Sequence, residues 1–490
     1  MDKKKLGWIA FFFILLGCSF ASVWLTDLTA EQLLFNLHVS LKGVNNNAVW
    51  SCLLFACSCS AAIMAAAVAL LYWQRRVNPQ GFIINWVDKL LHRRRTVVAV
   101  SVLFCLLCVN YNLEFTEFVR HQMIVTTLYQ EEYVDPKTVT YQFPEKKRNL
   151  IYIFLESMEV TYTNVNEGGA QSTDLIPQLR GLAQENVNFS PTAGFGGSFT
   201  LPGTTWTMAA MVGQTSGLPL KLPFDGEKYY GNYSKMLPGA WSIGDILEKE
   251  GYTQELLVGS DSSFAGRGDY FAQHGNYIIN DYNTALEDGR LPKGYHEWWG
   301  YEDRKLFAYA KEELLRLSKE DEPFNLTMLT VDTHFEDGYI CPLCPDDNRD
   351  QYANVIRCSS SQVYEFIQWI QQQDFYEDTT IIISGDHLSM DSNFFNRIED
   401  TYDRQVYNCI INPAVENPKA YEKNRVFTTL DMFPTTLAAM GVTFEGERLG
   451  LGTNLFSGKE TLAEQLGLEE LTEQLSRHSN YYNYHFLYTN

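Results

Sequence analysis

Residues 150–156 of this chain have the sequence Leu-Ile-Tyr-Ile-Phe-Leu-Glu, an apolar run that ends at a carboxylate. A short apolar run without polar alternation is typical of a strand that is buried on both faces of a sheet. In open α/β sheets, ligands bind just beyond the carboxyl ends of the strands. The run therefore predicts a central strand, with Glu156 at the edge of the sheet where ligands bind.

Three further runs repeat this pattern, at residues 255–258, 326–331 and 380–384. Polar residues follow each of them: a Gly-Ser-Asp segment, then His334, then Asp386 with His387. Helical stretches separate the strands, at residues 243–249, 302–317 and 359–373. This alternation predicts an α/β fold with a mainly parallel central sheet, in one catalytic domain over residues 146–490.

Three apolar runs of about membrane length precede the domain, at residues 7–26, 49–73 and 96–113. A helix needs about 20 apolar residues to cross a bilayer. Lys and Arg are concentrated before the first run and between the second and third, so the positive-inside rule places the domain outside the cytoplasm. The sequence predicts a transmembrane anchor of three helices over residues 1–113. Alternatively, Leu15-Leu16-Gly17-Cys18 marks a cleaved lipoprotein signal, and the domain is still exported.

Residues 114–145 join the anchor to the domain. Apolar residues between Phe115 and Leu128 recur at helical spacing, which predicts an amphipathic helix lying on the membrane surface. A helix packed on the domain fits the same spacing. The chain has 490 residues and a net charge of −21. The acidic excess lies after residue 130, so a nucleic acid partner is excluded for the exported part.

Three cysteines cluster in the exported part of the sequence: Cys341, Cys344 and Cys358. In an oxidising compartment, Cys358 is expected to form a disulfide with Cys341 or Cys344. A zinc site is the alternative interpretation. A Cys-x-x-Cys pair with one further cysteine and no nearby histidine lacks the fourth ligand that structural zinc requires.

A Gly-rich loop leads through Leu201-Pro202-Gly203 into Thr204, Thr205, Trp206 and Thr207, followed by the apolar residues 208–212. This pattern predicts a helix that begins at Thr204. A hydroxyl at that position is ordinarily a cap. The N-terminus of a helix also attracts a phosphoryl group, which would make Thr204 a nucleophile, with Thr205 as the alternative.

Glu156, Asp386 and His387 offer oxygen and nitrogen ligands at the ends of separate strands. Such ligands hold a divalent cation, and a cation beside a threonine hydroxyl lowers the pKa of that hydroxyl. We therefore predict a metal site formed by these three residues together with Thr204.

Five motifs together resemble the lipoteichoic acid synthase and phosphoglycerol transferase branch of the alkaline phosphatase superfamily. They are Glu156-Ser157-x-Glu159, Pro202-Gly203-Thr204 with Gly217-Leu218-Pro219-Leu220, Phe264-Ala265-Gly266-Arg267, Thr330 to His334, and Asp386-His387. The resemblance implies transfer of phosphoglycerol from phosphatidylglycerol to periplasmic glucans, with release of diacylglycerol. It also implies a multi-pass protein of the inner membrane with a periplasmic catalytic domain.

The same resemblance assigns roles to single residues. Thr204 would be the nucleophile that forms a threonine-linked intermediate, beside one divalent metal ion, Mn²⁺ in the first place and Mg²⁺ or Zn²⁺ as alternatives. His334 would act in catalysis, and His334, Arg267 and Trp206 would contact the substrate. Ala265 stands where lipoteichoic acid synthases have a tryptophan, so the contacts to glycerol differ. The oligomeric state is left open.

Three other functions are alternatives to phosphoglycerol transfer. Phosphoethanolamine transfer is the nearest rival within the superfamily. Sulfatase activity needs a Cys/Ser-x-Pro/Ala-x-Arg motif, which does not precede the predicted helix. An inactive binding module would be expected to have lost a metal ligand, yet all the candidate ligands are present.

Overall fold

The computed structural model describes residues 3–25, 29–38, 46–79, 81–82, 89, 94–221, 236–347, 350–399 and 401–488. Contacts divide the chain into two compact units. Residues 1–33 and 45–120 form a helical unit, and residues 34–44 and 121–490 form the catalytic unit.

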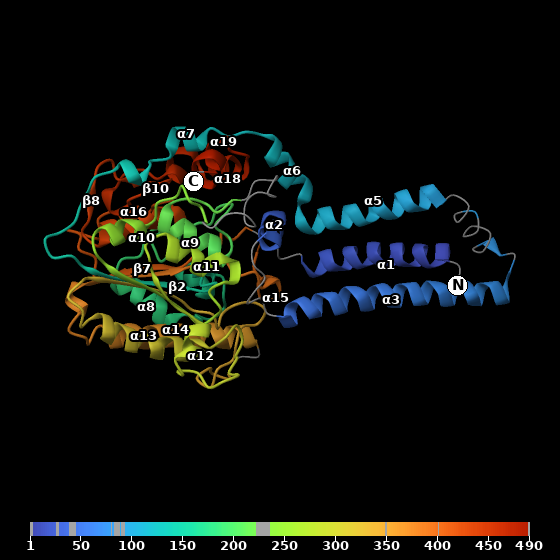
Figure 1. Ribbon diagram of the computed structural model, residues 1–490, viewed down its shortest axis with the longest axis horizontal. Helices are drawn as coiled ribbons and strands as arrows, with labels where there is room; N and C mark the ends of the chain where they lie inside the picture. The colour runs from blue at the N-terminus through green and yellow to red at the C-terminus, as the bar shows by residue number, and fades with distance from the viewer. Residues whose placement is uncertain are drawn as a thin grey trace. The chain divides into compact units, whose positions relative to one another are not determined.

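The helical unit contains three long helices, α1 (Lys3–Trp24), α3 (Asn46–Val77) and α5 (Arg94–Leu113), and α1 contacts both others (Figure 1). Two segments have the length and hydropathy to cross a membrane, Trp50–Val77 and Arg95–Leu113. The apolar part of α1, Ala10–Trp24, falls short of that length among the described residues. Two of the three predicted spans are therefore supported, and the first stays a prediction.

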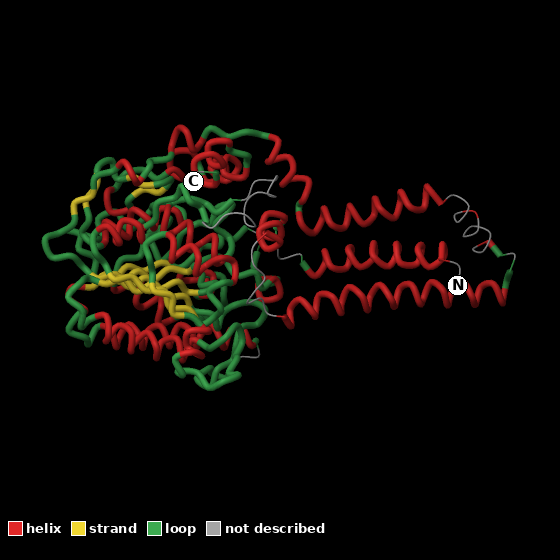
Figure 2. The backbone as a smooth tube through the Cα atoms, in the orientation of Figure 1, coloured by secondary structure: helices red, strands yellow, loops and turns green. Residues whose placement is uncertain are grey.

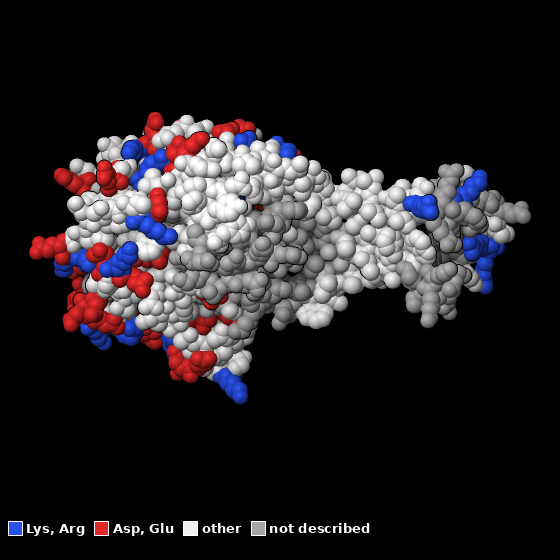
Figure 3. All heavy atoms as spheres, turned by 45° about the horizontal axis from the view of Figure 1, so that its top comes forward, with Lys and Arg blue, Asp and Glu red and all other residues white. Residues whose placement is uncertain are grey.

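The surface of this unit fits an apolar environment. Leu54 and Leu107 are 66% and 58% exposed, although both belong to helices rich in apolar residues. On the face shown in Figure 3, blue Lys and Arg side chains lie at the far end of the long helices, and the middle of these helices shows no charged side chains. Exposed apolar side chains of this kind are expected where lipid replaces water around a helix.

The segment between the long helices and the sheet, predicted as a juxtamembrane segment, divides into two parts. Helix α6 (Phe115–Met123) buries none of its residues, and its predicted position on a membrane surface remains a prediction. Helix α7 (Leu128–Glu132) instead packs on the catalytic unit, where the Tyr129 ring lies 5.2 Å from that of Tyr482. For α7, the packed alternative is the one that the structure shows.

The catalytic unit is built around a central sheet, drawn in yellow in Figure 2. This sheet has six strands in the order β4-β3-β5-β2-β6-β7. The strands are β2 (Asn149–Leu155), β3 (Thr253–Val258), β4 (Ile278–Asn280), β5 (Phe324–Leu329), β6 (Thr379–Gly385) and β7 (Asn408–Ile411). All neighbours are parallel except β7, which is antiparallel to β6. The mainly parallel α/β sheet and its four predicted strands are confirmed.

Strand β2 shows how the sheet organises the core. Leu150, Tyr152 and Phe154 face one hydrophobic cluster, and the alternating residues Ile151, Ile153 and Leu155 face the other. This alternation follows from the two-residue period of a strand. One side is covered by α9 (Thr207–Ser216), α10 (Ile243–Lys249), α11 (Arg267–Gln273), α16 (Met432–Ala439) and α18 (Leu468–Ser476). The other side is covered by α8 (Pro177–Glu185), α12 (Tyr282–Glu287), α13 (Asp303–Leu317) and α14 (Gln351–Ile370).

The predicted helices agree with α10 and α13, whereas α14 begins earlier than predicted. Asp350 caps α14, because its side chain accepts hydrogen bonds from the amides of Tyr352 and Ala353 at 3.0 and 3.4 Å. The smaller elements are α2 (Ala30–His38), α15 (Ser392–Phe395), α17 (Leu462–Leu466), α19 (Asn480–Tyr482), β1 (Tyr141–Gln142), β8 (Thr443–Phe444), β9 (Arg448–Leu449) and β10 (Gly452–Thr453).

Candidate active site

Two neighbouring strands bring the predicted metal ligands together. Leu155 of β2 is paired with Gly385 of β6, so the residues that follow them, Glu156 and Asp386, leave the sheet side by side. Glu156, Asp386 and His387 are all buried. One ligand atom from each lies within 4.8 Å of the others, which is close enough for a single cation.

His387 presents one nitrogen to this group. Its Nδ1 lies 2.8 Å from the backbone oxygen of Leu388, which fixes the tautomer that carries the proton on Nδ1. The remaining nitrogen, Nε2, lies 3.5 Å from Oε1 of Glu156 and 3.4 Å from Oδ2 of Asp386. Three ligand atoms from three residues therefore converge.

One carboxylate oxygen of Asp386 is hydrogen-bonded, and the other is not. Its Oδ1 accepts hydrogen bonds of 2.7 Å from the amides of Ser157 and His387. Its Oδ2 accepts no hydrogen bond from the described residues, and its near neighbour is Nε2 of His387 at 3.4 Å. A buried carboxylate oxygen without a hydrogen bond is costly unless a cation binds it. The arrangement therefore fits a divalent metal ion.

Ser157 is held in an unusual conformation that supports this site. Its φ is 51°, in the left-handed region that non-glycine residues seldom adopt. This conformation directs the Ser157 amide to Asp386, while the Ser157 hydroxyl donates to Oε1 of Glu156 at 2.9 Å. Such strained residues concentrate at functional sites. Apart from the position of Ser157 directly after Glu156, no sequence pattern signals this role.

The charges of the three residues are coupled. Burial alone would raise the pKa of Glu156, but His334 and His387 outweigh it and lower that pKa to about 2. Burial and the Glu156 carboxylate raise the pKa of Asp386 to about 7. Burial opposes protonation of His387, yet Asp386 and Glu156 raise its pKa to about 9. A cation that binds here takes the place of the proton on His387.

The hydroxyl beside this group belongs to Thr207. Its Oγ1 donates to Oε2 of Glu156 at 3.2 Å and lies 3.3 Å from Nε2 of His387. Thr207 is the first residue of α9, after the extended residue Trp206. The amides of the first helical turn have no carbonyl partner within their own helix, so they favour a phosphoryl group.

The predicted start of this helix at Thr204 is wrong. Thr204 is fully buried in the turn before α9, where its Oγ1 donates to the oxygen of Leu201 at 2.9 Å and accepts from the amide of Leu201 at 2.8 Å. The hydroxyl of Thr204 therefore uses its donor and its acceptor within this turn. The structure does not bring Thr204 to the metal ligands. The missed signal was that Thr207, and not Thr204, directly precedes the apolar residues that begin with Met208.

Arg267 lies at the start of α11 and is 4% exposed. Its Nη1 donates to Oγ of Ser260 at 2.9 Å, and no described residue accepts from its Nε. Burial lowers the pKa of Arg267, and the charges of Glu156 and Asp386 oppose that effect. The guanidinium therefore lies in the electric field of the metal ligands without a carboxylate partner among the described ion pairs. Such a group is suited to a phosphate.

His334 follows β5, and its ring lies beside aromatic side chains. Its Nδ1 is 2.6 Å from the oxygen of Phe335, which leaves Nε2 open. Its ring centroid is 4.7 Å from that of Trp299 and 4.9 Å from that of Phe335. Burial lowers the pKa of His334, while the charge of Glu156 opposes this shift. Trp299 was not singled out from the sequence, because two adjacent tryptophans in a loop carry no motif.

Two other candidates have different surroundings. Trp206 is half-buried against the core immediately before Thr207, and its contact with substrate stays a prediction. Glu159 is fully buried and forms an ion pair with Arg404, whose Nε lies 2.9 Å from Oε2. Glu159 also accepts from the amide of Ser389 at 2.7 Å. Glu159 therefore fixes the loop after β6 and does not join the metal ligands.

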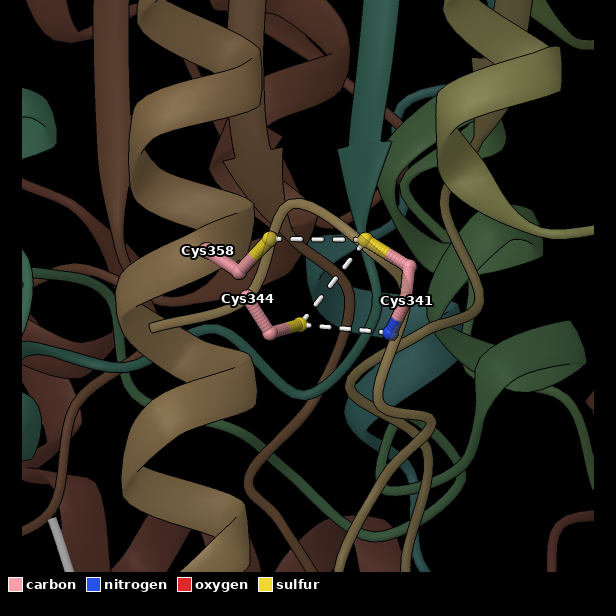
Figure 4. A group of neighbouring side chains, drawn as sticks. All are labelled: Cys341, Cys344 and Cys358. Atoms are coloured by element: carbon pink, nitrogen blue, oxygen red, sulfur yellow. Dashed lines mark hydrogen bonds between the residues drawn. The ribbon is translucent and has the colours of Figure 1, made fainter. Parts of the chain in front are cut away.

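The three cysteines lie together but are free thiols, so the predicted disulfide is not formed in the structure (Figure 4). The sulfurs of Cys341 and Cys358 are 3.6 Å apart, whereas a disulfide requires about 2.05 Å. The disulfide stays a prediction.

Comparison with known proteins places this site in a family. The family model described as Sulfatase matches residues 148–442, which includes Glu156, Thr207 and Asp386. This chain belongs to the Sulfatase family. Membership does not specify the reaction, because one fold supports many chemistries.

Two curated relatives have the same name. Phosphoglycerol transferase I of Xanthomonas campestris pv. campestris is 32% identical to the chain over 346 residues, which are 67% of this chain and 46% of that protein. Phosphoglycerol transferase I of Shigella flexneri is 31% identical over 339 residues, which are 67% of this chain and 42% of that protein. The chain thus matches less than half the length of these relatives.

A solved structure extends the similarity of fold. The integral membrane protein lipooligosaccharide phosphoethanolamine transferase A from Neisseria meningitidis superposes with a TM-score of 0.50 and 13% sequence identity. The superposition covers 89% of this chain and 84% of that one. At this identity, the similarity concerns the fold alone.

Proposed function

We propose that the chain is a metal-dependent phosphoglycerol transferase that moves phosphoglycerol from phosphatidylglycerol to periplasmic glucans and releases diacylglycerol. The observation that carries the proposal is the hydroxyl of Thr207, 3.2 Å from Glu156, at the N-terminus of α9. The names of the two curated relatives support the phosphoglycerol group. The nucleophile is Thr207, in place of the predicted Thr204.

Glu156, Asp386, His387 and Thr207 would hold one divalent cation. A carboxylate and imidazole set suits Mn²⁺, with Mg²⁺ and Zn²⁺ as alternatives. When bound, such a cation supplies positive charge that favours ionisation of a nearby hydroxyl and neutralises phosphoryl oxygens. The open Oδ2 of Asp386 supports this assignment.

The reaction would proceed in two halves. Oγ1 of Thr207 attacks the lipid phosphorus, the bond to diacylglycerol oxygen breaks, and phosphoglycerol is carried on Thr207. A sugar hydroxyl then attacks the same phosphorus and releases Thr207. The hydrogen bond from Thr207 to Glu156 orients the oxygen for attack, and the first-turn amides of α9 stabilise the phosphoryl oxygens.

Two further residues would act on the substrate. Nε2 of His334 would take up the proton that Thr207 loses on attack and pass it to the leaving diacylglycerol oxygen. In the second half, Nε2 would take the proton of the acceptor hydroxyl and return it to the released oxygen of Thr207. Nδ1 of His334 is occupied by Phe335, which leaves Nε2 for this exchange. Arg267 binds the phosphate of the donor, because its buried guanidinium has unused donors. Trp206 would contact the glycerol beside Thr207.

The anchor is consistent with a lipid donor. Helices α3 and α5 have the length and hydropathy of membrane spans. We therefore place the protein in the inner membrane as a multi-pass protein with its catalytic unit in the periplasm, where both phosphatidylglycerol and glucans are accessible.

The test uses the full chain in detergent with phosphatidylglycerol labelled in its headgroup glycerol. With Mn²⁺, we expect diacylglycerol release and transfer of label to glucan. Phosphatidylethanolamine, labelled in its headgroup, serves as the competing donor. Transfer from phosphatidylethanolamine alone would replace the proposal with phosphoethanolamine transfer, and no release from either lipid would overturn phosphodiester transfer.

A further inference from the structure

Three cysteines near α14 converge on one central sulfur. Figure 4 shows Cys358 of α14 and Cys344 of the preceding loop on one side, with both sulfurs pointing toward Cys341. Sγ of Cys341 lies 3.6 Å from Sγ of Cys358 and 3.8 Å from Sγ of Cys344. Cys341 therefore has a short sulfur–sulfur distance to both other cysteines, within a group whose three sulfurs all lie within 4.8 Å of one another.

The three thiols differ in their access to solvent. Cys341 and Cys358 are 2% and 3% exposed, whereas Cys344 is only half-buried. Cys358 is fixed on its helix, where Nε2 of Gln362 donates to its sulfur at 3.3 Å. A reagent from solution therefore meets Cys344 before the other two.

We propose that these residues form a thiol–disulfide exchange site, in which Cys341 is the shared partner of two alternative disulfides. Cys344 reacts first, with an external disulfide compound as the oxidant. This inference uses the exported location proposed above and is independent of the transfer reaction. An S–S bond of about 2.05 Å requires each neighbour of Cys341 to approach by roughly 1.5 Å, which side-chain rotation can supply.

Hydrogen bonding supports the central position of Cys341. Cys344 first, and Cys358 next, lower the pKa of the Cys341 thiol, and the amide of Leu343 donates to its sulfur at 3.4 Å. The hydrogen bond to Cys341 raises the pKa of Cys344 to about 12. These hydrogen bonds favour a thiolate on Cys341 over a thiolate on Cys344.

The exchange takes place in three steps. Sulfur of Cys344 attacks the external disulfide, its proton passes through Cys341 to the first thiol released, and a mixed disulfide remains on Cys344. The Cys341 thiolate attacks that mixed disulfide at the Cys344 sulfur and expels the second half of the oxidant as a thiolate. Cys358 then attacks Cys341, and its proton passes to Cys344, which leaves as a thiol.

Loop length determines which disulfide persists. Cys341 and Cys358 are 17 positions apart, whereas Cys341 and Cys344 are 3 apart. The longer loop loses more entropy in the unfolded chain when it is closed, so the Cys341–Cys358 bond stabilises the fold more. The final state ties the segment after His334 to α14 and leaves Cys344 as an exchangeable thiol.

The experiment starts with the reduced full-length protein in detergent. Oxidised glutathione is added, free thiols are blocked with N-ethylmaleimide, and unreduced tryptic peptides are mapped. Trypsin cleaves after Arg349 and Arg357, which separates Cys358 from the other two cysteines. We expect a Cys341–Cys358 linkage and alkylated Cys344. Three alkylated thiols after oxidation, or a stoichiometric metal that blocks alkylation, would overturn the proposal.

Variants test the order of events. Cys358→Ser should stop at the Cys341–Cys344 disulfide. Cys341→Ser and Cys341→Ala should both accumulate glutathione on Cys344, because the resolving thiol is lost. Cys409→Ser, which changes a fully buried cysteine of β7, is the control and should leave the wild-type linkage. Formation of a Cys344–Cys358 disulfide in the Cys341 variants at the wild-type rate would show that Cys341 is not the shared partner.

Discussion

Oγ1 of Thr207 donates a hydrogen bond to Oε2 of Glu156 across 3.2 Å, although the two residues are 51 positions apart. The first residue of α9 is therefore held against the residue that follows β2. This contact distinguishes Thr207 from Thr204, because the hydroxyl of Thr204 is hydrogen-bonded to Leu201 instead. It makes the identity of the nucleophile testable by a matched pair of variants.

Thr207→Ala should reduce diacylglycerol release by at least roughly 10³-fold, because the attacking oxygen is removed. Thr204→Ala should retain most activity and lose about 1 kcal/mol of unfolding free energy, the usual worth of one hydrogen bond. Initial rates with labelled phosphatidylglycerol and thermal unfolding of both variants provide the measurement. Full activity in Thr207→Ala would remove this residue from the mechanism.

Removal of a ligand should abolish metal binding without unfolding the catalytic unit. Asp386→Asn replaces the buried carboxylate whose Oδ2 is open. We expect Mn²⁺ affinity to fall by more than about 100-fold, since even residues outside the ligand set change affinity by 10 to 100-fold. Calorimetric titration of dialysed protein measures this affinity. Unchanged affinity in Asp386→Asn would place the cation elsewhere.

Glu159→Gln is the matched control for the metal ligands, because Glu159 is an equally buried acid near the same strand end. It should keep Mn²⁺ affinity but lose stability, since Arg404 would be left without its carboxylate. Loss of one member of a buried pair costs about 3–5 kcal/mol, and the partial exposure of Arg404 places the cost at the lower end. A stable variant with weakened Mn²⁺ binding would assign Glu159 to the site instead.

The sequence was sufficient to predict the strand ends but not the loop before α9. Glu156, Asp386 and His387 each follow an apolar strand directly, so strand register alone brings them together. Thr204 and Thr207 are separated by two residues, and helix boundaries read from a sequence carry an uncertainty of that size. The turn that captures Thr204 is itself local, because both of its hydrogen bonds join Thr204 to Leu201 three positions earlier. A helix cap at Thr204 is an equally local alternative, so the sequence alone does not separate the two.

The partners of buried polar side chains could not be predicted from the sequence either. The pair between Glu159 and Arg404 joins residues far apart in the chain, and nothing near either one signals it. Strand β7 was missed because only four residues pair with β6, too few for a periodic signal. Such long-range contacts depend on how the helices and strands pack against one another. The local sequence pattern predicts the helices and strands but not their packing.

A pH effect on stability is expected from Glu255 in β3. Burial first, and the charge of Glu313 next, raise the pKa of Glu255 from 4.5 to about 7. The folded state therefore binds a proton that the unfolded state loses between these values. This contribution to stability is complete below pH 4.5 and is lost as the pH rises through about 7.

Glu255→Gln should consequently reduce the fall in melting temperature between pH 5 and pH 8, because the titrating group is gone. Glu320→Gln is the control, since Glu320 is another partner of Arg316 but lies near the surface. It should leave the pH dependence as it is in the wild type. Equal pH dependence in Glu255→Gln and the wild type would contradict the assignment.

Arg267 offers a test in which activity and stability change in opposite directions. Its guanidinium is 4% exposed, and no described residue accepts from its Nε. A buried charge without an ion-pair partner among the described residues destabilises the fold, so Arg267→Gln should raise the melting temperature. The same change should lower kcat/KM for phosphatidylglycerol by roughly 10²-fold, because charge-assisted bonds to the phosphate are lost.

Arg425 is the matched control, as it is 8% exposed but paired with Glu464 at 2.9 Å. Arg425→Gln should lower the melting temperature and keep activity in the protein that remains folded. If Arg267→Gln lowers the melting temperature while kcat/KM is retained, Arg267 is a structural residue and the donor phosphate is bound by other groups.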